Sequence, residues 1–451
     1  MRKMSHLALA KGLFAVSCLA TDMQSAHLYA ATSPVTARPA AIAQEDLRDA
    51  YIYLLGRLLV MRQQQLDFKE GMGWNQLVHR KPGAVDWPNP NLDVAYSEAW
   101  VALDEDSCTQ VSVPKIIGRY YTVQLLNGWG ETLANINERR FPKHPYGEFA
   151  LCLKGAKVAL PAGAVRIDLP VRTARVLTRV ELGADREAAE RLQHRFSLKP
   201  TGSPVLPVLP AAPDFEIGRL PGVEAFDFTD AALAEPDLNP GMQPLQAKVR
   251  AIAAQVQDPA VRAQVDAQLR SQVWRDVAKA SAVMGNGTVR KGWGRPSVSG
   301  AYGSDYLTRT LVDYGGIWAN TQQEVRYYRA AQSADGKPLD GGRSYALTFT
   351  RDQLPEHFAH YFWSVTAVNS TNFRVLPNAQ QRFLLNNQSG LKFNDDGSLT
   401  LYFGPQAPAG AAESNWLPTV AGQPYRLILR YYGAKGSVAT GDYFPPALEN
   451  I

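Results

Sequence analysis

The chain has 451 residues, of which 45% are hydrophobic and 20% are charged, and its formal net charge is +5. A chain of this length holds two or three domains, and its balance of apolar and charged residues excludes an intrinsically disordered protein. It holds no block of Lys and Arg of the kind that follows a nucleic-acid backbone, so we expect no nucleic-acid partner.

The first residues have the composition of an export signal. Arg2 and Lys3 give a basic start, an apolar run extends from Leu7 to Ala20, and small residues follow. This run is too short to span a membrane and no other stretch is long and apolar enough, so we expect no transmembrane segment. We therefore predict a signal peptide over residues 1–31 and a periplasmic or secreted protein. Lipid anchoring at Cys18 is the alternative, because the preceding residues weakly resemble a lipoprotein cleavage box.

Two cysteines, Cys108 and Cys152, remain once the leader is removed. Exported proteins meet an oxidising compartment, so this pair is a candidate disulfide. Such a bond would close a loop of roughly 44 residues and contribute on the order of 4 kcal/mol by restricting the unfolded chain. The alternative is a pair of buried free thiols.

Residues 42–198 are predicted to form a β domain with a leading helix. Apolar residues recur at helical spacing between Ile42 and Phe68, which favours one helix that packs on a sheet. A short helix is also expected over Arg186–His194. Alternating apolar runs predict strands over Val94–Leu103, Gln110–Val113, Tyr120–Leu126, Phe149–Leu153, Val165–Ile167 and Val171–Val180.

The middle of the chain is predicted to be a stiff linker followed by helices. Residues 199–222 are rich in Pro, which prevents regular structure and stiffens a connection. Residues 223–318 show helix-like spacing of apolar residues over several stretches. The last of these stretches, Asp305–Val312, is followed by a pair of glycines that can end a helix.

Residues 319–451 are predicted to form a second β domain. Short alternating runs are separated by Gly, Asn, Asp and Pro, which is typical of strands joined by turns. The runs are Tyr345–Phe349, Phe373–Leu376, Leu399–Phe403 and Tyr425–Leu429. Consecutive strands of this kind indicate a β-sandwich or jelly roll. The predicted fold class is therefore mainly β, with two jelly-roll-like β-sandwich domains, an N-terminal helix and a helical segment between the domains.

Several motifs resemble two families of proteins of unknown function. The segments Asn91–Ser97 and Arg119–Leu126 resemble the domain-of-unknown-function family 1254. Farther along, Tyr302–Leu307, Phe362–Ser364 and Asn415–Pro418 resemble family 1214. The two families usually occur in this order on one chain. The resemblance covers nearly everything after the leader and implies two β-rich, jelly-roll-like domains with helical additions, but no established reaction.

The candidate site is a cleft that joins the two halves. Polar side chains at strand ends could orient a ligand, and aromatic rings could form the walls. The candidate ligand-binding residues are Asp93, Tyr96, Arg119, Tyr121, Gln124, Trp363, Asn415, Trp416 and Arg430. In the structural alternative, the two tryptophans lie in the core, the Asp and Asn side chains bond to turn backbone, and Arg430 pairs with a carboxylate.

Other chemistries have less support in the sequence. His357 and His360 are candidate metal ligands because a helix would put both imidazoles on one side, but they come just before a strand and have no third ligand nearby. The sequence contains neither a Gly-x-Ser-x-Gly nucleophile motif nor a phosphate-binding Gly loop. We predict no cofactor.

These observations predict an exported protein that binds, and in one version also processes, a small or carbohydrate-like molecule in the cleft. One alternative is a structural or assembly protein without a ligand, in which the same motifs secure the domain interface. Another is a hydrolase or lyase that uses Asp93 with Tyr96 or Arg119. The sequence leaves open whether the protein is an enzyme and whether it forms a homo-oligomer.

Overall fold

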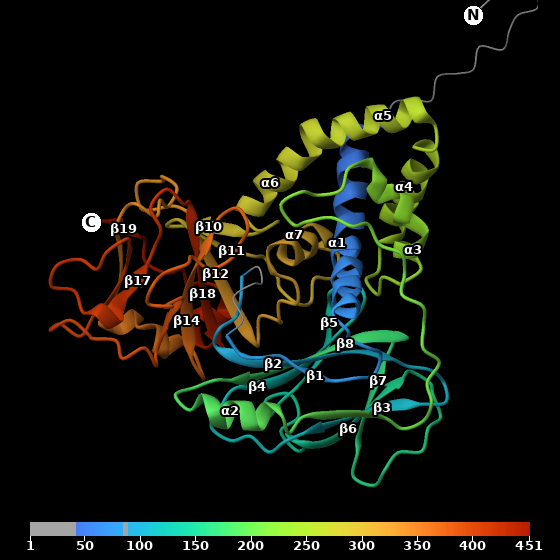
Figure 1. Ribbon diagram of the computed structural model, residues 1–451, viewed down its shortest axis with the longest axis horizontal. Helices are drawn as coiled ribbons and strands as arrows, with labels where there is room; N and C mark the ends of the chain where they lie inside the picture. Colours follow the sequence, from blue (N-terminus) through green and yellow to red (C-terminus); the bar gives the residue numbers. More distant parts are fainter. Residues whose placement is uncertain (1–41, 84–88) are drawn as a thin grey trace, which may run out of the picture. The chain divides into compact units, whose positions relative to one another are not determined.

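The computed structural model describes residues 42–83 and 89–451. The predicted signal peptide over residues 1–31, and the alternative lipid-anchor residue Cys18 within it, lie outside the described residues. All described residues belong to one compact unit, in which the strands form four sheets (Figure 1).

Two sheets pack face to face in the N-terminal half. The strands are β1 (Val78–His79), β2 (Val94–Ala102), β3 (Cys108–Val113), β4 (Tyr121–Leu126), β5 (Thr132–Ile136), β6 (Gly147–Leu153), β7 (Val165–Leu169), β8 (Thr173–Glu181) and β9 (Ser197–Pro200). A five-stranded sheet has the order β1-β2-β8-β4-β5, and a four-stranded sheet has the order β7-β6-β3-β9. Ala99 and Val176 of the first sheet share one hydrophobic core with Val111 and Phe149 of the second. Only every second residue of each strand enters this core, because side chains alternate across a sheet.

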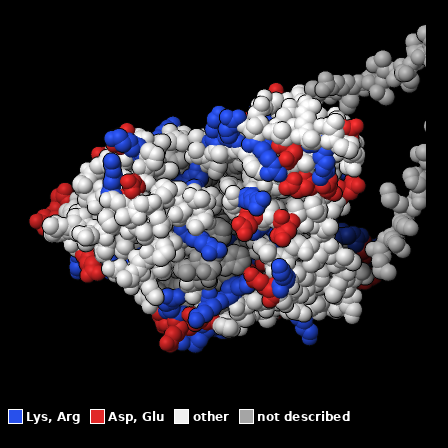
Figure 2. All heavy atoms as spheres, turned by 45° about the horizontal axis from the view of Figure 1, so that its top comes forward, with Lys and Arg blue, Asp and Glu red and all other residues white. Residues whose placement is uncertain are grey.

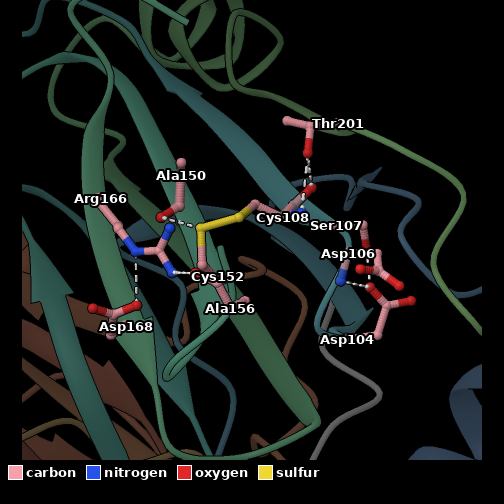
Figure 3. The surroundings of a disulfide bond; sticks show 10 residues. All are labelled: Asp104, Asp106, Ser107, Cys108, Ala150, Cys152, Ala156, Arg166, Asp168 and Thr201. Atoms are coloured by element: carbon pink, nitrogen blue, oxygen red, sulfur yellow. Dashed lines mark hydrogen bonds and ion pairs between the residues drawn. A yellow bond between two sulfur atoms is a disulfide. The ribbon is translucent and has the colours of Figure 1, made fainter. Parts of the chain in front are cut away.

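A disulfide joins the two central strands of the smaller sheet (Figure 3). Cys108 on β3 and Cys152 on β6 are direct cross-strand partners, with an S–S distance of 2.06 Å and a Cα–Cα distance of 4.4 Å. Thr201, just beyond β9, donates from Oγ1 to the carbonyl of Cys108 at 3.0 Å. Of the two alternatives open from the sequence, the structure contains the disulfide.

The described residues form eight α-helices, several of which gather around one long helix. They are α1 (Gln44–Lys69), α2 (Arg186–Gln193), α3 (Thr229–Leu233), α4 (Gln243–Gln255), α5 (Pro259–Gln268), α6 (Trp274–Ala282), α7 (Tyr306–Gly316) and α8 (Gly436–Thr440), with 3-10 turns η1 (Val223–Phe228), η3 (Arg351–Gln353), η4 (Pro355–Phe358) and η5 (Glu413–Asn415) and a π-helical turn η2 (Leu269–Val273). Helix α1 is buried on nearly every side, and its Leu54 and Leu58 share a core with Val249 of α4 and Leu311 of α7. A helix with so many apolar side chains needs such a cover, and the helices of the middle segment supply part of it.

The C-terminal half also contains two sheets that share a core. The strands are β10 (Thr288–Arg290), β11 (Trp293–Arg295), β12 (Val325–Ala330), β13 (Tyr345–Phe349), β14 (Trp363–Asn369), β15 (Leu384–Asn386), β16 (Leu399–Gly404), β17 (Trp416–Pro418), β18 (Tyr425–Tyr432) and β19 (Glu449–Asn450). A six-stranded sheet has the order β10-β11-β12-β18-β14-β15, and a four-stranded sheet has the order β17-β16-β13-β19. Val365 and Leu429 of the larger sheet share a core with Leu347 and Leu401 of the smaller one.

The mainly β fold class is confirmed, with its leading helix and the helices between the two β regions. The predicted strand over Phe373–Leu376 is wrong. Phe373 has a φ of 62°, and the side chains of Asn369 and Asn372 accept backbone bonds from Thr371 and Arg374, so this segment forms a turn. The jelly-roll connectivity and the domain boundaries stay predictions.

Candidate ligand-binding site

One face of the six-stranded sheet is polar. Along β18, Leu427 and Leu429 enter the core of the C-terminal half. Because side chains alternate along a strand, the residues at the alternate positions of β18 face away from that core. These residues are Arg426, Ile428, Arg430 and Tyr432. On the neighbouring strand β12, Tyr327 lies directly opposite Arg430 and therefore on the same polar face.

The five-stranded sheet of the N-terminal half has a polar face of the same kind. Tyr96 on β2 and Arg179 on β8 are direct cross-strand partners on the side away from the core. The Arg179 guanidinium lies 5.4 Å from the centre of the Tyr96 ring. It donates to the side-chain carbonyl of Gln124 on β4, and to the backbone carbonyl of Trp318 at 2.8 Å. These contacts fix the guanidinium in place.

A small cavity of about 140 Å³ lies where residues of the two polar faces meet. Tyr96 and Arg179 line it from the N-terminal half, Tyr327 and Arg430 line it from the C-terminal half, and Trp318 lines it from the segment after α7. Tyr96, Arg179 and Trp318 also line an adjoining large cavity of about 860 Å³. The small cavity thus has walls from three parts of the chain and shares one of its sides with a volume large enough for an organic ligand.

Four arginines line the small cavity: Arg179, Arg329, Arg426 and Arg430. No Asp or Glu is among the described residues that line it. None of these four arginines forms an ion pair within the part of the chain that the structure describes. On the face drawn in Figure 2, by contrast, Lys and Arg side chains are interspersed with Asp and Glu.

The arginines bond to neutral acceptors instead. Arg430 donates to Thr366 Oγ1 at 3.1 Å and to the backbone carbonyl of Asn89 at 3.3 Å. Arg329 donates to the last backbone carbonyls of α6, including that of Ala282 at 2.6 Å. Burial, together with the nearby charge of Arg426, lowers the pKa of Arg329 to about 9, and burial lowers the pKa of Arg426 to about 10. These shifts mark sites where a positive charge is held at an energetic cost.

The wall of the large cavity toward α1 is different, because it contains an arginine with carboxylate partners. Arg175 lies between Asp67 at 2.5 Å and Glu98 at 2.7 Å. The rings of Trp100 and Trp318 lie 4.9 Å and 5.0 Å from its guanidinium. The charge of this group is matched by two carboxylates of the protein, so we regard it as part of the scaffold and the small cavity as the site.

Two of the nine candidate residues named from the sequence, Tyr96 and Arg430, line the small cavity. Gln124 lies behind the wall and holds Arg179. Asp93 links the two halves of the chain, since it accepts bonds from Ser364 Oγ at 2.5 Å and from Asn386 Nδ2 at 3.2 Å. Burial raises the pKa of Asp93, while its two hydrogen bonds and the charge of Arg430 oppose that rise.

The structure does not bring the other five candidates to the cavity. Trp363 is buried in the core of the C-terminal half, and Trp416 donates to the carbonyl of Gly404 at 2.9 Å beside that core. Asn415 bonds to the backbone of Lys392 and Thr400. Arg119 donates to the carbonyls of Glu181 and Leu182, and Tyr121 packs in the core of the N-terminal half. Each of these side chains has a structural role where it stands.

The candidate metal ligands do not form a site. His357 is the third residue of the 3-10 turn η4, His360 follows that turn, and both are exposed. The described segments of the chain bring together no group of three His, Cys, Asp or Glu side chains suited to a metal ion. Over the same segments, no helix combines the length and the apolar character that a membrane span needs.

Among the cavity residues that the sequence reasoning missed are Tyr327, Arg179, Arg329 and Arg426. The alternation of polar and apolar residues along one strand could have indicated one of them, Arg426. In the run Tyr425–Tyr432 the polar residues alternate with core residues, so Arg426 belongs on the same face as Arg430. The other three depend on which strands become neighbours, which a single strand pattern does not specify.

The comparisons with known proteins agree with this architecture. Residues 74–200 match the family "Protein of unknown function (DUF1254)", and residues 324–436 match the family "Protein of unknown function (DUF1214)". The VPA0106 protein from Vibrio parahaemolyticus has a crystal structure that matches with a TM-score of 0.60 at 18% identity, over 90% of this chain and 99% of that one.

An uncharacterized protein from Burkholderia cenocepacia matches with a TM-score of 0.44 at 15% identity, over 89% of this chain and 88% of that one. The comparison with curated proteins found no match. At these identities the structural matches concern the fold alone. The chain thus contains a DUF1254 region in its N-terminal half and a DUF1214 region in its C-terminal half.

Proposed function

We propose that this protein binds a small molecule in the small cavity and its continuation into the large one. The observation that carries the proposal is unfilled space between two polar sheet faces that belong to different halves of the chain. Protein interiors are close-packed, and a concave site with a few converging polar groups and aromatic rings is the usual form of a ligand site. Tyr and Trp rings in the wall suit the apolar face of a carbohydrate-like or aromatic molecule.

A purely structural interface fits the cavity less well. Such an interface would be packed, and its polar groups would satisfy one another. Asp93 follows this rule through its bonds to Ser364 and Asn386. The arginines of the small cavity follow it only in part, because they bond to neutral acceptors but form no ion pair with any described residue. The contacts therefore favour a ligand site held together by a structural rim.

The contacts of Asp93 also give no support to a hydrolase or lyase that uses Asp93 with Arg119. The Asp93 carboxylate is already engaged across the two halves, and Arg119 is bonded to backbone carbonyls after β8. Neither residue lines the small cavity. Binding is therefore the function that we propose, and turnover is not part of the proposal.

Export belongs to the same proposal. The basic and apolar start of the sequence favours a signal peptide, and a buried disulfide between Cys108 and Cys152 suits an oxidising compartment. We propose that the mature protein acts in the periplasm or outside the cell. Detection of the processed chain in periplasmic or secreted fractions tests this point, and its retention with an intact leader in the cytoplasm would contradict it.

Binding is tested by a thermal-shift screen of the protein against sugars, small aromatic acids and their neutral analogues. A ligand stabilises the state that it binds, by about 2.7 kcal/mol at a concentration of 100 times Kd. We expect one chemical class to raise the melting temperature. The screen is repeated with Ile428→Phe, which replaces the aliphatic side chain by a larger aromatic ring that fills part of the small cavity.

A matched control keeps this test specific. Ile117 is 78% exposed and lies outside both cavities, so Ile117→Phe makes the same chemical change where no ligand is expected. We expect the ligand shift to disappear in Ile428→Phe and to persist in Ile117→Phe. The absence of any shift with the unaltered protein, or an equal shift in both variants, would refute the proposed site.

A further inference from the structure

We infer that the ligand of the small cavity is an organic anion, a molecule with a carboxylate or phosphate group on an apolar or aromatic body. This inference rests on the proposed binding function and adds the chemical class of the ligand. It begins from the charge of the lining: four arginines and, among the described residues, no carboxylate.

Burying a charge without a partner is costly, and four like charges around one space also repel one another. Of the four, Arg179 and Arg430 are 4% and 3% exposed, and Arg329 is 9% exposed. The charge of Asp93 acts on Arg430, but Asp93 does not line the small cavity and its carboxylate accepts bonds from Ser364 and Asn386. A bound anion would supply the counter-charge that the protein does not.

The arginines also have hydrogen-bond donors to offer. A guanidinium carries five N–H groups in a planar fork that matches carboxylate and phosphate oxygens. Arg430 uses two of its nitrogens in bonds to Thr366 and Asn89. The Nε group of Arg426 is buried and has no partner among the described residues. Arg426 and Arg430 lie on the same face of β18, and Arg329 lies on the neighbouring strand β12, so several guanidinium groups border one space.

The remaining wall indicates an organic molecule and not a bare inorganic ion. Tyr96, Tyr327 and Tyr432 contribute rings and hydroxyl groups, and Leu311 and Ile317 contribute apolar surface. The large cavity that adjoins this wall has room for the body of a ligand. An anionic head against the arginines and an apolar body against these rings would satisfy both parts of the lining.

The test compares charged and neutral versions of the same molecules. The probes are phenylacetate, its neutral amide, phenyl phosphate and inorganic phosphate, each titrated calorimetrically at physiological salt. We expect phenylacetate or phenyl phosphate to bind at least about tenfold more tightly than the amide, because charge-assisted hydrogen bonds are lost in the neutral molecule. The two anions separate a carboxylate site from a phosphate site, and inorganic phosphate measures the contribution of the organic body.

Two arginines of the same strand give a matched pair of variants. Arg329 lines the cavity and bonds to the end of α6, whereas Arg326 lies outside both cavities and bonds to carbonyls of α8, including that of Ala439 at 2.7 Å. Both are buried, at 9% and 7% exposure. Arg329→Gln should weaken binding of the anion at least about tenfold, and Arg326→Gln should change it by less than about twofold.

Arg426→Gln serves as a second cavity variant, since its partly exposed side chain is easier to replace without loss of folding. Equal binding of the anions and the amide, or equal weakening by Arg326→Gln and Arg329→Gln, would overturn the inference. If only neutral molecules bind and Ile428→Phe abolishes that binding, the proposed function stands and the anion inference fails. If no molecule binds at all, both fail.

Discussion

Replacement of Arg309 by Met should destabilise the protein strongly, because this side chain neutralises two buried carboxylates. The Arg309 side chain on α7 has no exposed surface, and its Nη1 and Nη2 atoms lie 3.0 Å from Glu131 and 3.0 Å from Asp237. The guanidinium also lies 4.7 Å from the centre of a Trp129 ring. A Met side chain keeps much of the apolar contact but removes the charge. Helix α7 ends in the cavity wall, so the same group holds the site in position.

The expected loss is about 3–5 kcal/mol in the free energy of unfolding, which is typical when one partner of a buried ion pair is removed. The structure places the estimate in this range because Asp237 is fully buried and Glu131 nearly so. Burial raises the pKa of Glu131, and Arg309 counteracts that rise. Without Arg309 the folded state would bind protons more readily, so the loss should be smaller in mildly acidic buffer than at neutral pH.

Urea unfolding followed by fluorescence measures this loss, with Arg262→Met as the matched control. Arg262 makes a similar forked contact with Asp227, at 2.8 Å and 2.6 Å, but this pair lies in solvent. Exposed ion pairs contribute about 0–1 kcal/mol, so the control should unfold almost as the unaltered protein does. A loss in Arg309→Met no larger than the loss in Arg262→Met would refute the reasoning.

Three further predictions concern stability. Reduction of the Cys108–Cys152 bond should lower the free energy of unfolding by about 4 kcal/mol, because the bond closes a loop with a separation of 44 residues; a urea midpoint that reductant leaves unchanged would contradict this. Both oxygens of Asp313 lack partners among the described residues, and burial raises the pKa of this carboxyl well above the usual value. Above about pH 4, folding therefore takes up a proton at Asp313. The free energy of unfolding should then fall as the pH rises, by up to about 1.4 kcal/mol per pH unit. Asp313→Asn should therefore be more stable than the unaltered protein at neutral pH and lose this advantage near pH 4 in calorimetric scans, whereas a pH-independent difference would argue against a buried neutral acid. Asp93→Ala should cost about 2–4 kcal/mol, because the buried Ser364 Oγ and the partly buried Asn386 Nδ2 lose their acceptor. A loss below about 1 kcal/mol in urea unfolding would show that the link between the halves is weak.

The sequence predicted the long first helix and many of the longer strands because their signals are local. Alternation between Tyr425 and Leu429 and helical spacing between Ile42 and Phe68 depend only on neighbours in the chain, and both elements form as predicted. The strand β5 was not anticipated, since Thr132–Ile136 contains Asn135, a residue that is uncommon in strands. Asn135 is accommodated there because its side chain bonds to Asn320, which comes from a distant part of the chain.

The site could be predicted only in part, because it depends on contacts between distant segments. Tyr96 and Arg430 stand on strands that the sequence identifies, but nothing in either strand shows that they face the same cavity. Trp363 was proposed as a site residue because of its type, yet it is one residue away from the polar face and points into the core. Neighbouring residues of a strand point to opposite faces of the sheet, so a residue can be on a correctly predicted strand and still point away from the site.

The most direct test of the central claim is a crystal structure of the protein soaked with a bromine-substituted aromatic carboxylic acid. The anomalous signal of bromine gives the position of the ligand independently of any expectation. The account predicts one strong signal in the small cavity or at its junction with the large one, with the carboxylate against Arg430 and neighbouring arginines. A signal confined to other surfaces, or an empty cavity at saturating ligand, would contradict the claim that this cavity is the functional site.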